Sequence, residues 1–346
     1  MKISKQEKDF YKSFSQHGTG NALVQVPEKD IVLLIHIAYL DIEKNTTDWM
    51  MEDYVAIARK GFYNITSSDI QQLQEISIEN AIKMLRLSGG MDATNIIYLY
   101  LKNLSALYRR RYKFSNILAT QQFPQVEQIG PRSLLEYGNC ENELLFTWMQ
   151  WRKWIYDVDN RSAQETGYLF EPILLSCVGG ESISHKNSPI KRLNENDEQT
   201  SEGRQIDCYI EENREAYELK LRVTIAASGQ GRFKEEMTFP KEAKKAGITP
   251  VLIVFDPTPS SLLDKLKSEY QKHGGKCLIG DDAWDELISK AGTEMGLFIE
   301  KYVEPPIKSM SKDMDKINPQ NVSLKVNLDS VTISDDLGKE YIIPRK

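Results

Sequence analysis

Cysteine and histidine, from which most zinc sites and disulfide frameworks are built, are scarce in this chain. Only four of each occur among its 346 residues. No two cysteines form a C-x-x-C pair and the histidines are scattered: Cys140, Cys177, Cys208 and Cys277; His17, His36, His185 and His273. This spacing disfavours disulfides, zinc chemistry and a histidine–metal catalytic centre. We expect the cysteines to be reduced residues of the core.

Long apolar runs are also missing. No eighteen consecutive apolar residues occur, so the sequence predicts no transmembrane span. The N-terminal segment MKISKQEKDFYKSFSQHG lacks the apolar stretch of a signal peptide. Hydrophobic residues nevertheless make up 40% of the chain and aromatic residues 9%, which is enough to bury a core. We therefore expect a folded cytoplasmic protein with no membrane partner, built as one large domain or two.

An excess of positive charge, the usual mark of a nucleic-acid-binding domain, is absent, because the formal net charge is −6. The acid-free stretch 94–126 is a local exception. Its basic residues, interleaved with tyrosines, are Lys102, Arg109, Arg110, Arg111 and Lys113. Basic side chains that face phosphates bind DNA with salt-dependent affinity. The alternative is a solvated helix end whose arginines complement the helix dipole.

The stretch RQIDCYIEENREAYELKLRV, residues 204–223, reads as two short strands joined by a charged turn. Side chains alternate between the two faces of a strand, so Glu218 and Lys220 point to one side and the intervening residues point into a core. If the turn at 211–215 pairs the strands, Asp207 falls near Glu218 and Lys220. Two carboxylates and an ammonium group then share one site, which suits a metal ion held against a phosphate.

The two carboxylates predict that the bound metal is Mg²⁺, because Mg²⁺ prefers oxygen ligands and retains several water molecules. Lys220 would orient or help to deprotonate an attacking water and would offset negative charge in the transition state. The alternative is a charged strand face that only makes salt bridges, since Glu-x-Lys is common in a chain that is 27% charged. A second instance, Glu242-Ala243-Lys244, is expected on a solvated helix face among further lysines.

The pattern Asp207…Glu218-Leu219-Lys220 resembles the core motif of the PD-(D/E)XK nucleases, with Ile206 in the place of the proline. Four segments together resemble ApaLI-like restriction endonucleases: GYLFEPILLSCVGG (167–180), YELKLRVTIAASGQGRFKEE (217–236), TPVLIVFDPTP (249–259) and IGDDAW (279–284). The resemblance implies an α/β fold of the restriction-endonuclease type, in which helices flank a central mixed β-sheet.

The resemblance further implies a type II restriction endonuclease that uses Mg²⁺ to hydrolyse double-stranded DNA at a specific sequence. The products would carry 5′-phosphate and 3′-hydroxyl ends. Asp207, Glu218 and the carbonyl of Leu219 would bind the metal, and Lys220 would serve the attacking water. Glu171 would bind a water molecule of the metal or contact one of the metal's direct ligands. The alternative is that Glu171 is simply an exposed glutamate.

A restriction endonuclease of this kind is expected to have two partners, a second copy of itself and a DNA methyltransferase, and two alternative functions remain open. Palindromic targets match the two-fold symmetry of a homodimer. A cognate DNA methyltransferase is expected as a genetic rather than a physical partner. The alternatives are another nuclease with the same core, acting in repair or junction resolution, and a non-catalytic DNA-binding protein.

The segment AASGQGR, residues 226–232, follows the second strand and is expected close to the site. Its two glycines allow the backbone to approach a ligand. Gln230 and Arg232 have side chains that read adenine and guanine edges, whereas Lys234 suits a phosphate. With Ser228, these residues are the expected DNA contacts beside the site. The alternative is a tight turn, followed by a salt bridge of Arg232 in the next helix.

The rest of the pattern divides the chain into three parts. Residues 1–150 read as mainly helical and are expected to contact DNA, to form a dimer, or both. Residues 151–305 are expected to form the nuclease core, and residues 306–346 are expected to form a tail with a β-hairpin.

Two features of the middle of the chain bear on the fold. Helices are expected over 134–156 and over 161–177, and the polar segment 181–203 is expected to be a long loop. Three tryptophans at three-residue spacing in the first of these helices are expected in a core or a dimer interface.

Overall fold

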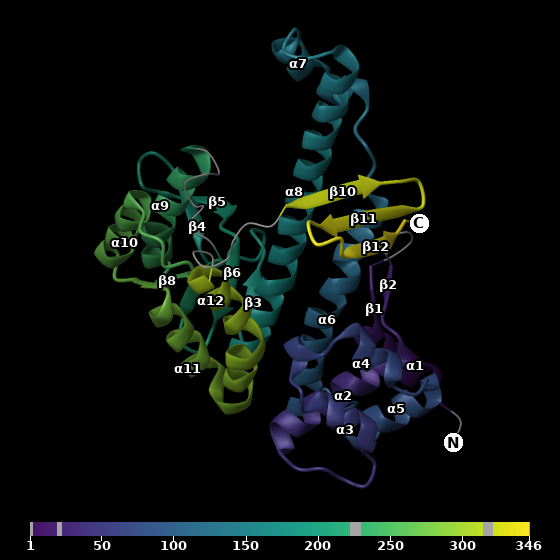
Figure 1. The fold of residues 1–346 in the computed structure, drawn as a ribbon. Helices are drawn as coiled ribbons and strands as arrows, with labels where there is room; N and C mark the ends of the chain where they lie inside the picture. Colours follow the sequence, from purple (N-terminus) through teal and green to yellow (C-terminus); the bar gives the residue numbers. More distant parts are fainter. Residues whose placement is uncertain (1–2, 19–22, 222–229, 314–320, 346) are drawn as a thin grey trace. The chain divides into compact units, whose positions relative to one another are not determined.

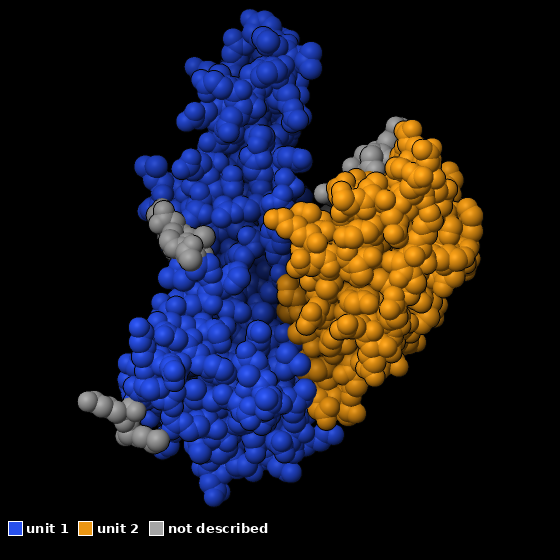
Figure 2. Space-filling model, turned by 180° about the vertical axis from the view of Figure 1, so that it is seen from behind, with its two compact units in different colours: residues 1–170, 316–346 blue, residues 171–315 orange. Residues whose placement is uncertain are grey.

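The computed structural model describes residues 3–18, 23–221, 230–313 and 321–345. The chain forms two compact units, unit 1 (residues 1–170 with 316–346) and unit 2 (residues 171–315), which are coloured separately in Figure 2. Both divisions fall farther along the chain than the boundaries expected after residues 150 and 305.

Unit 1 is mainly helical, as the sequence predicts for the N-terminal region. Its helices are α1 (Lys5–Ser15), α2 (Glu28–Glu43), α3 (Glu52–Ala58), α4 (Ser67–Gln72), α5 (Ile78–Leu87), α6 (Ile96–Thr120), α7 (Val126–Glu136) and the first part of α8 (Asn142–Val178) (Figure 1). A short ribbon of β1 (Gln16–His17) and β2 (Val24–Gln25) follows α1. Residues 31–38 of α2 are buried on every side of the helix. The helices α1, α3, α5 and α6 pack around α2 and cover them.

Three helices of unit 1 differ from the expected ranges. The helix α6 continues to Thr120, so the basic residues lie in its middle and cannot complement the dipole at its C-terminal end. The helix expected over 134–156 is instead broken between α7 and α8, where Gly138 takes a φ of 89°. The helix α8 then runs on through Pro172 and includes the separate helix expected over 161–177.

The C-terminal residues form a small antiparallel sheet that belongs to unit 1. Its strands, in spatial order, are β10 (Val322–Val326), β11 (Ser330–Asp335) and β12 (Glu340–Pro344). The first two strands make the predicted hairpin, and the third extends it. Near the C-terminus, a guanidinium nitrogen of Arg345 donates a hydrogen bond to the carbonyl of Gln121 at 3.3 Å.

Unit 2 is built on a five-stranded mixed sheet, which confirms the predicted fold. Its spatial order is β3 (Glu181–Ile183), β6 (Ile206–Ile210), β7 (Glu215–Lys220), β8 (Thr249–Val254) and β9 (Lys276–Ile279). The strand β6 runs antiparallel to β3 and β7, whereas β8 runs parallel to β7 and β9. The helices that accompany it include α9 (Gln230–Lys245), α10 (Ser261–Lys272), α11 (Asp281–Phe298) and α12 (Glu304–Asp313), together with the end of α8 (Figure 1).

The core of unit 2 lies between the sheet and its helices. Leu252 and Val254 of β8 are buried against Phe239 of α9 and against Leu266 and Tyr270 of α10. A parallel strand covered on both faces is apolar along its whole length, and β8 is buried from its second residue to its last. The core therefore fixes α9 against the sheet next to β7.

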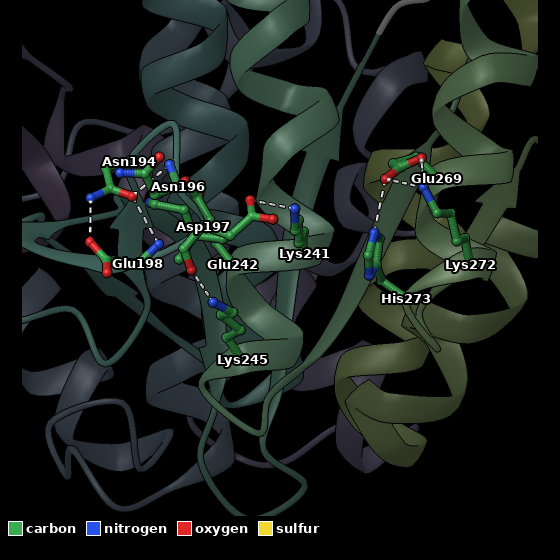
Figure 3. Close-up of polar contacts among 11 residues, drawn as sticks. Asn194, Asn196, Asp197, Glu198, Lys241, Glu242, Lys245, Glu269, Lys272 and His273 are labelled. Atoms are coloured by element: carbon green, nitrogen blue, oxygen red, sulfur yellow. Dashed lines mark hydrogen bonds and ion pairs between the residues drawn. The ribbon is translucent and has the colours of Figure 1, made fainter.

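The polar segment 181–203 is not the long loop that was expected. After β3 it forms a two-stranded ribbon of β4 (Lys191–Leu193) and β5 (Gln199–Gly203). The side chain of Asn194 accepts a hydrogen bond from the backbone N–H of Glu198 at 2.9 Å, and Asp197 adopts a left-handed φ of 61°. Asp197 also pairs with Lys241 of α9 (Figure 3). Such side-chain-to-backbone bonds let Asn and Asp build a tight turn within a polar segment.

The four cysteines all lie in the described ranges and form no disulfide, and two of them, Cys177 and Cys208, are buried as expected. Cys140 departs from the expectation, because it is exposed in the turn between α7 and α8. In the described ranges, no helix is both long enough and apolar enough to cross a membrane.

Candidate functional site

The hairpin of β6 and β7 brings the predicted carboxylates onto one face of the sheet. Backbone pairing between these strands reaches Cys208–Tyr217, and the same register continued by one residue places Asp207 opposite Glu218. Residues directly opposite each other in an antiparallel pair project to the same face. The turn that sets this register holds Arg214 in a left-handed conformation with φ 51°.

Asp207, Glu218 and Lys220 gather where the hairpin ends. Lys220 Nζ lies 3.3 Å from Glu218 Oε2, and Asp207 Oδ2 accepts a hydrogen bond from the backbone N–H of Leu219 at 3.3 Å. The side chain of Leu219 is buried in the core, whereas Glu218 and Lys220 are half-buried. The alternation predicted from the sequence is therefore present, and we call these three charged residues the carboxylate–lysine cluster.

Burial and neighbouring charges shift the protonation of this cluster. Burial raises the pKa of Glu218 and Asp207 raises it further, although Lys220 partly lowers it. Burial alone would lower the pKa of Lys220. The carboxylates of Glu218, Asp207 and Glu236 outweigh that effect and raise the pKa of Lys220. Lys220 is therefore a charged ammonium group at neutral pH.

The cluster has the donor set and the charge imbalance that suit a divalent cation. The pKa values of Glu218 and Glu171 are both raised, first by burial and second by Asp207, so these carboxylates lie in an unfavourable negative field. Oxygen ligands suit a hard cation such as Mg²⁺, which would relieve that field. Within the described residues, no three His, Cys, Asp or Glu side chains are grouped closely enough to hold a metal on their own. A metal at Asp207 and Glu218 would draw further ligands from backbone, water or substrate, and the Leu219 carbonyl is the nearest candidate by position.

Glu171 lies on the part of α8 that belongs to unit 2, together with the strands. It is exposed, and its pKa is raised by partial desolvation and by Asp207, while Lys220 lowers it. Its link to the carboxylate–lysine cluster is thus electrostatic. This position agrees with an outlying ligand and equally with an exposed glutamate.

Glu236 is part of the site although it was not singled out from the sequence. It lies on α9, and its Oε1 is 3.4 Å from Lys220 Nζ, so Lys220 contacts a carboxylate on α9 as well as Glu218 on its own strand. Its other oxygen, Oε2, is buried without a hydrogen-bond partner. The available signal was the segment 217–236 that carries the family resemblance, in which Glu236 is the last residue.

Arg204 is a second unpredicted residue of the site. It is buried at 7% exposure, stacks its guanidinium over the ring of Phe239 at 5.7 Å, and lies 3.6 Å from Glu242 Oε2. Arg204 and Phe239 line a small enclosed cavity together with Glu218 and Lys220. Arg204 therefore supplies buried positive charge behind the carboxylate–lysine cluster.

The second Glu-x-Lys pattern is only partly the solvated face that was expected. Lys244 is exposed, but Glu242 is buried at 3% exposure. Besides its ion pair with Arg204, Glu242 accepts a hydrogen bond from the backbone N–H of Leu193 at 3.2 Å. The expectation was wrong for Glu242, because a helix that packs on a sheet turns one face inward whatever charge it carries.

The expected DNA contacts beside the site are described only in part. Ser228 lies outside the described residues. Gln230 and Arg232 fall in the first turn of α9, but their side chains are outside the described set. Lys234 is exposed on the same helix, two residues before Glu236.

Two arginines of the basic stretch are engaged within unit 1. Arg109 donates hydrogen bonds to the carbonyls of Ser13 at 3.1 Å and Gln16 at 2.6 Å, and burial lowers its pKa. Arg110 donates to the hydroxyls of Ser162 at 2.9 Å and Thr166 at 3.1 Å. These contacts attach α6 to the end of α1 and to α8.

Of the other basic residues of this stretch, one is engaged in an ion pair and two are exposed. Lys113 pairs with Glu165, whereas Arg111 is exposed and its guanidinium lies over the ring of Phe62 at 5.1 Å. Lys102 is also exposed. Arg111 and Lys102 thus remain accessible to a phosphate, and Arg109, Arg110 and Lys113 stabilise the helical packing.

Known proteins resemble this chain over most of its length. The profile of the ApaLI-like restriction endonuclease family matches residues 60–304. A protein of Acetobacter pasteurianus described as type II restriction enzyme ApaLI is 42% identical over 268 residues, which cover 75% of this chain and 67% of that protein. Comparison with solved structures gave no match. The range matched by the family profile includes the whole carboxylate–lysine cluster.

Proposed function

The chain belongs to the ApaLI-like restriction endonuclease family, and we propose that it cleaves double-stranded DNA at a specific sequence by Mg²⁺-dependent hydrolysis. The family and the relative are restriction endonucleases, and sequence-specific DNA cleavage is the activity that they share. The observation that carries the proposal is the common face of Asp207, Glu218 and Lys220 at the end of the β6–β7 hairpin. This arrangement is the one expected of a PD-(D/E)XK nuclease.

Asp207 and Glu218 would hold the metal, with the carbonyl of Leu219 as a further ligand. Bound Mg²⁺ would polarise a phosphoryl oxygen and lower the pKa of a water molecule. Glu171 would contact water bound beside this metal. The raised pKa values of Glu218 and Glu171 support this assignment, because a cation would offset the repulsion that raises them.

Lys220 lies among carboxylates that raise its pKa in the metal-free site, so its ammonium form predominates there. As an ammonium group it would donate hydrogen bonds to the attacking water or to the phosphate, and it would offset negative charge in the transition state. Attack of water on phosphorus then breaks the bond to the 3′ oxygen; the attacking water gives up one proton to the solvent, and the leaving 3′ oxygen takes up one from the solvent. The products are a 5′-phosphate and a 3′-hydroxyl.

DNA contacts and partners complete the proposal. Lys234, Gln230, Arg232 and Ser228 would contact DNA beside the site, and exposed Arg111 is the most accessible arginine of the basic stretch. One catalytic cluster cuts one strand, so cleavage of a palindromic duplex calls for a homodimer. A cognate DNA methyltransferase would protect the host genome without binding this chain.

Incubating the protein with a long, sequenced duplex and Mg²⁺ should give discrete fragments, and EDTA should abolish them. The ends of the fragments should map to one recognition sequence and carry 5′-phosphates that a ligase accepts. A smear of products would indicate a nuclease of the same core that acts in repair or junction resolution. Binding without cleavage across several divalent metals would contradict the proposal and favour a non-catalytic DNA-binding protein.

Replacing Glu236 by glutamine should lower the cleavage rate about tenfold, a loss of about 1.4 kcal/mol of transition-state stabilisation. The reason is that Glu236 helps to hold the ammonium of Lys220 in place and raises its pKa. The high-pH limb of the rate profile should also move to lower pH, because less negative charge then retains the proton of Lys220. Cleavage rates against pH would measure both effects.

The neighbouring substitution Glu235→Gln is the matched control, because the Glu235 side chain is more than half exposed and pairs with Arg192 instead. It should change neither the rate nor the pH profile. Equal rates for the Glu236→Gln variant and the wild type would show that the contact with Lys220 is only structural.

A further inference from the structure

Apolar side chains are exposed along the hairpin formed by α7 and the N-terminal half of α8, residues 126–160, which we call the α7–α8 arm. Its exposed large hydrophobic residues are Val126, Leu134, Leu135, Tyr137, Leu144, Trp148, Ile155 and Tyr156. Leu135 is 86% exposed and Trp148 54%. Apolar groups that are exposed together in one region of a soluble protein mark interaction surfaces.

These side chains are not simply an unfinished core of the arm. The arm has its own core, in which Ile129 of α7 is buried with Leu145 and Met149 of α8. Leu144 and Trp148 adjoin these buried positions but face outward. With Ile155, they recur at steps of four and seven residues, which places them in one stripe along α8. The stripe is therefore an outer face of a hairpin that is already packed.

Within unit 1, the arm extends beyond the bundle of α1 to α5, with α7 at its far end (Figure 1). The same end of unit 1 is a narrow projection in the space-filling view (Figure 2). The α1–α5 bundle thus does not cover the apolar stripe.

The charge of the arm argues against DNA as its partner. It contains six acidic residues and three basic ones, a net charge of −3. Two of its three cations are already paired within the arm, Arg152 with Glu136 and Lys153 with Asp157. A phosphate backbone needs accessible positive charge, which this surface does not offer. Its exposed tryptophan, tyrosines and leucines are instead typical of the core of a protein–protein interface.

We propose that the α7–α8 arm is the surface through which two copies of this chain associate. This inference rests on the proposed function, because one carboxylate–lysine cluster per chain cuts one strand and a double-strand cut needs a second copy. In a two-fold interface the same patch meets itself, so an apolar stripe is self-complementary, whereas a patch of one charge sign would repel its copy. Beside the stripe, two of the arm's acidic residues are neutralised by ion pairs, Glu136 with Arg152 and Asp157 with Lys153, so the net charge of −3 is carried by the other charged residues of the arm.

The mass of the full-length protein in solution tests the proposal. Sedimentation velocity at micromolar concentration should give twice the mass of one chain for the wild type. The double variant Leu135→Glu, Trp148→Glu places four charges in the two-fold interface and should weaken association by at least about a hundredfold, since each interface anchor contributes about 2 kcal/mol or more. The milder Trp148→Ala variant should weaken association in the same direction by a smaller factor.

The matched control is Leu337→Glu, which introduces the same charge at a residue that is also 86% exposed but lies outside the arm, in the turn between β11 and β12. It should remain dimeric, and circular dichroism should show that every variant is folded. A monomeric wild type, or an arm variant as dimeric as the control, would overturn the proposal. Because mass is measured without DNA or metal, a failure of the proposed function would appear separately, as a dimer that does not cleave.

Discussion

Replacing Lys220 by alanine is expected to reduce DNA cleavage about a hundred- to thousandfold, the usual cost of losing one donor that stabilises charge in the transition state. Lys220 Nζ lies 3.3 Å from Glu218 Oε2 and is held as an ammonium by the carboxylates around it. The reduction should appear in kcat, with little change in the affinity for DNA. Single-turnover cleavage and filter binding would separate the two quantities.

The matched control for this experiment is Lys244→Ala, because Lys244 belongs to the second Glu-x-Lys pattern and is exposed. It should cleave at the wild-type rate. Since Lys220→Ala also leaves Glu218 and Glu236 without their shared cation, circular dichroism should accompany each assay, and Lys220→Met preserves more of the side-chain volume. Wild-type cleavage by a folded Lys220 variant would reduce the carboxylate–lysine cluster to a structural salt bridge.

Asp207→Asn should abolish cleavage and at the same time stabilise the metal-free protein. Asp207 is a proposed metal ligand, and its charge raises the pKa values of Glu218 and Glu171. Removing that charge relieves this repulsion. The melting temperature should therefore rise, by about 2–4 °C for each 1 kcal/mol or so of stability gained. Mg²⁺ should raise the melting temperature of the wild type, because it binds the native state, but not that of the variant.

The same variant has a signature in the pH dependence of stability. A carboxyl group whose folded pKa is raised binds its proton more tightly in the native state than in the unfolded chain. Stability of the metal-free wild type should therefore fall as the pH rises above about 4.5, the ordinary value for glutamate. The fall should continue until the raised pKa of Glu218 is passed. In Asp207→Asn this fall should be smaller, and melting curves between acidic and neutral pH would measure it.

Asp197→Asn supplies the control for the stability experiment. Asp197 is in the same unit, but its side chain pairs with Lys241, which lowers its pKa. Its removal should not stabilise the protein and should leave the response to Mg²⁺ unchanged. A destabilised Asp207→Asn variant that still gains stability from Mg²⁺ would place the metal elsewhere.

Local patterns in the sequence were sufficient to predict that Asp207, Glu218 and Lys220 lie together on one face of the sheet. The alternation around Leu219 follows from strand geometry alone, and the short turn before Glu215 pairs the strands so that Asp207 falls opposite Glu218. The apolar run that forms β8 likewise indicates a buried strand without knowledge of its neighbours. These features depend on residues close together in the chain.

The surroundings of the site depend on contacts between distant segments. Glu236 reaches Lys220 because α9 packs on the sheet, and Arg204 is buried because the same helix covers it with Phe239. A Glu-x-Lys pattern does not reveal which of its residues turns inward, so Glu242 was assigned to solvent although it is buried. The ordering of residues 181–203 has the same origin, since the β4–β5 turn is fastened to α9 by Lys241.

By itself, the sequence determined the family, the α/β fold and the trio of Asp207, Glu218 and Lys220, because motif spacing and strand periodicity are local properties. Only the tertiary structure decided which charges are available. It engaged Arg109 and Arg110 in helix packing, surrounded Lys220 with carboxylates that keep it charged, and left the apolar stripe of the α7–α8 arm exposed. Burial, exposure and pKa are set by what packs against a residue, and in these cases the packing partner lies far away in the chain.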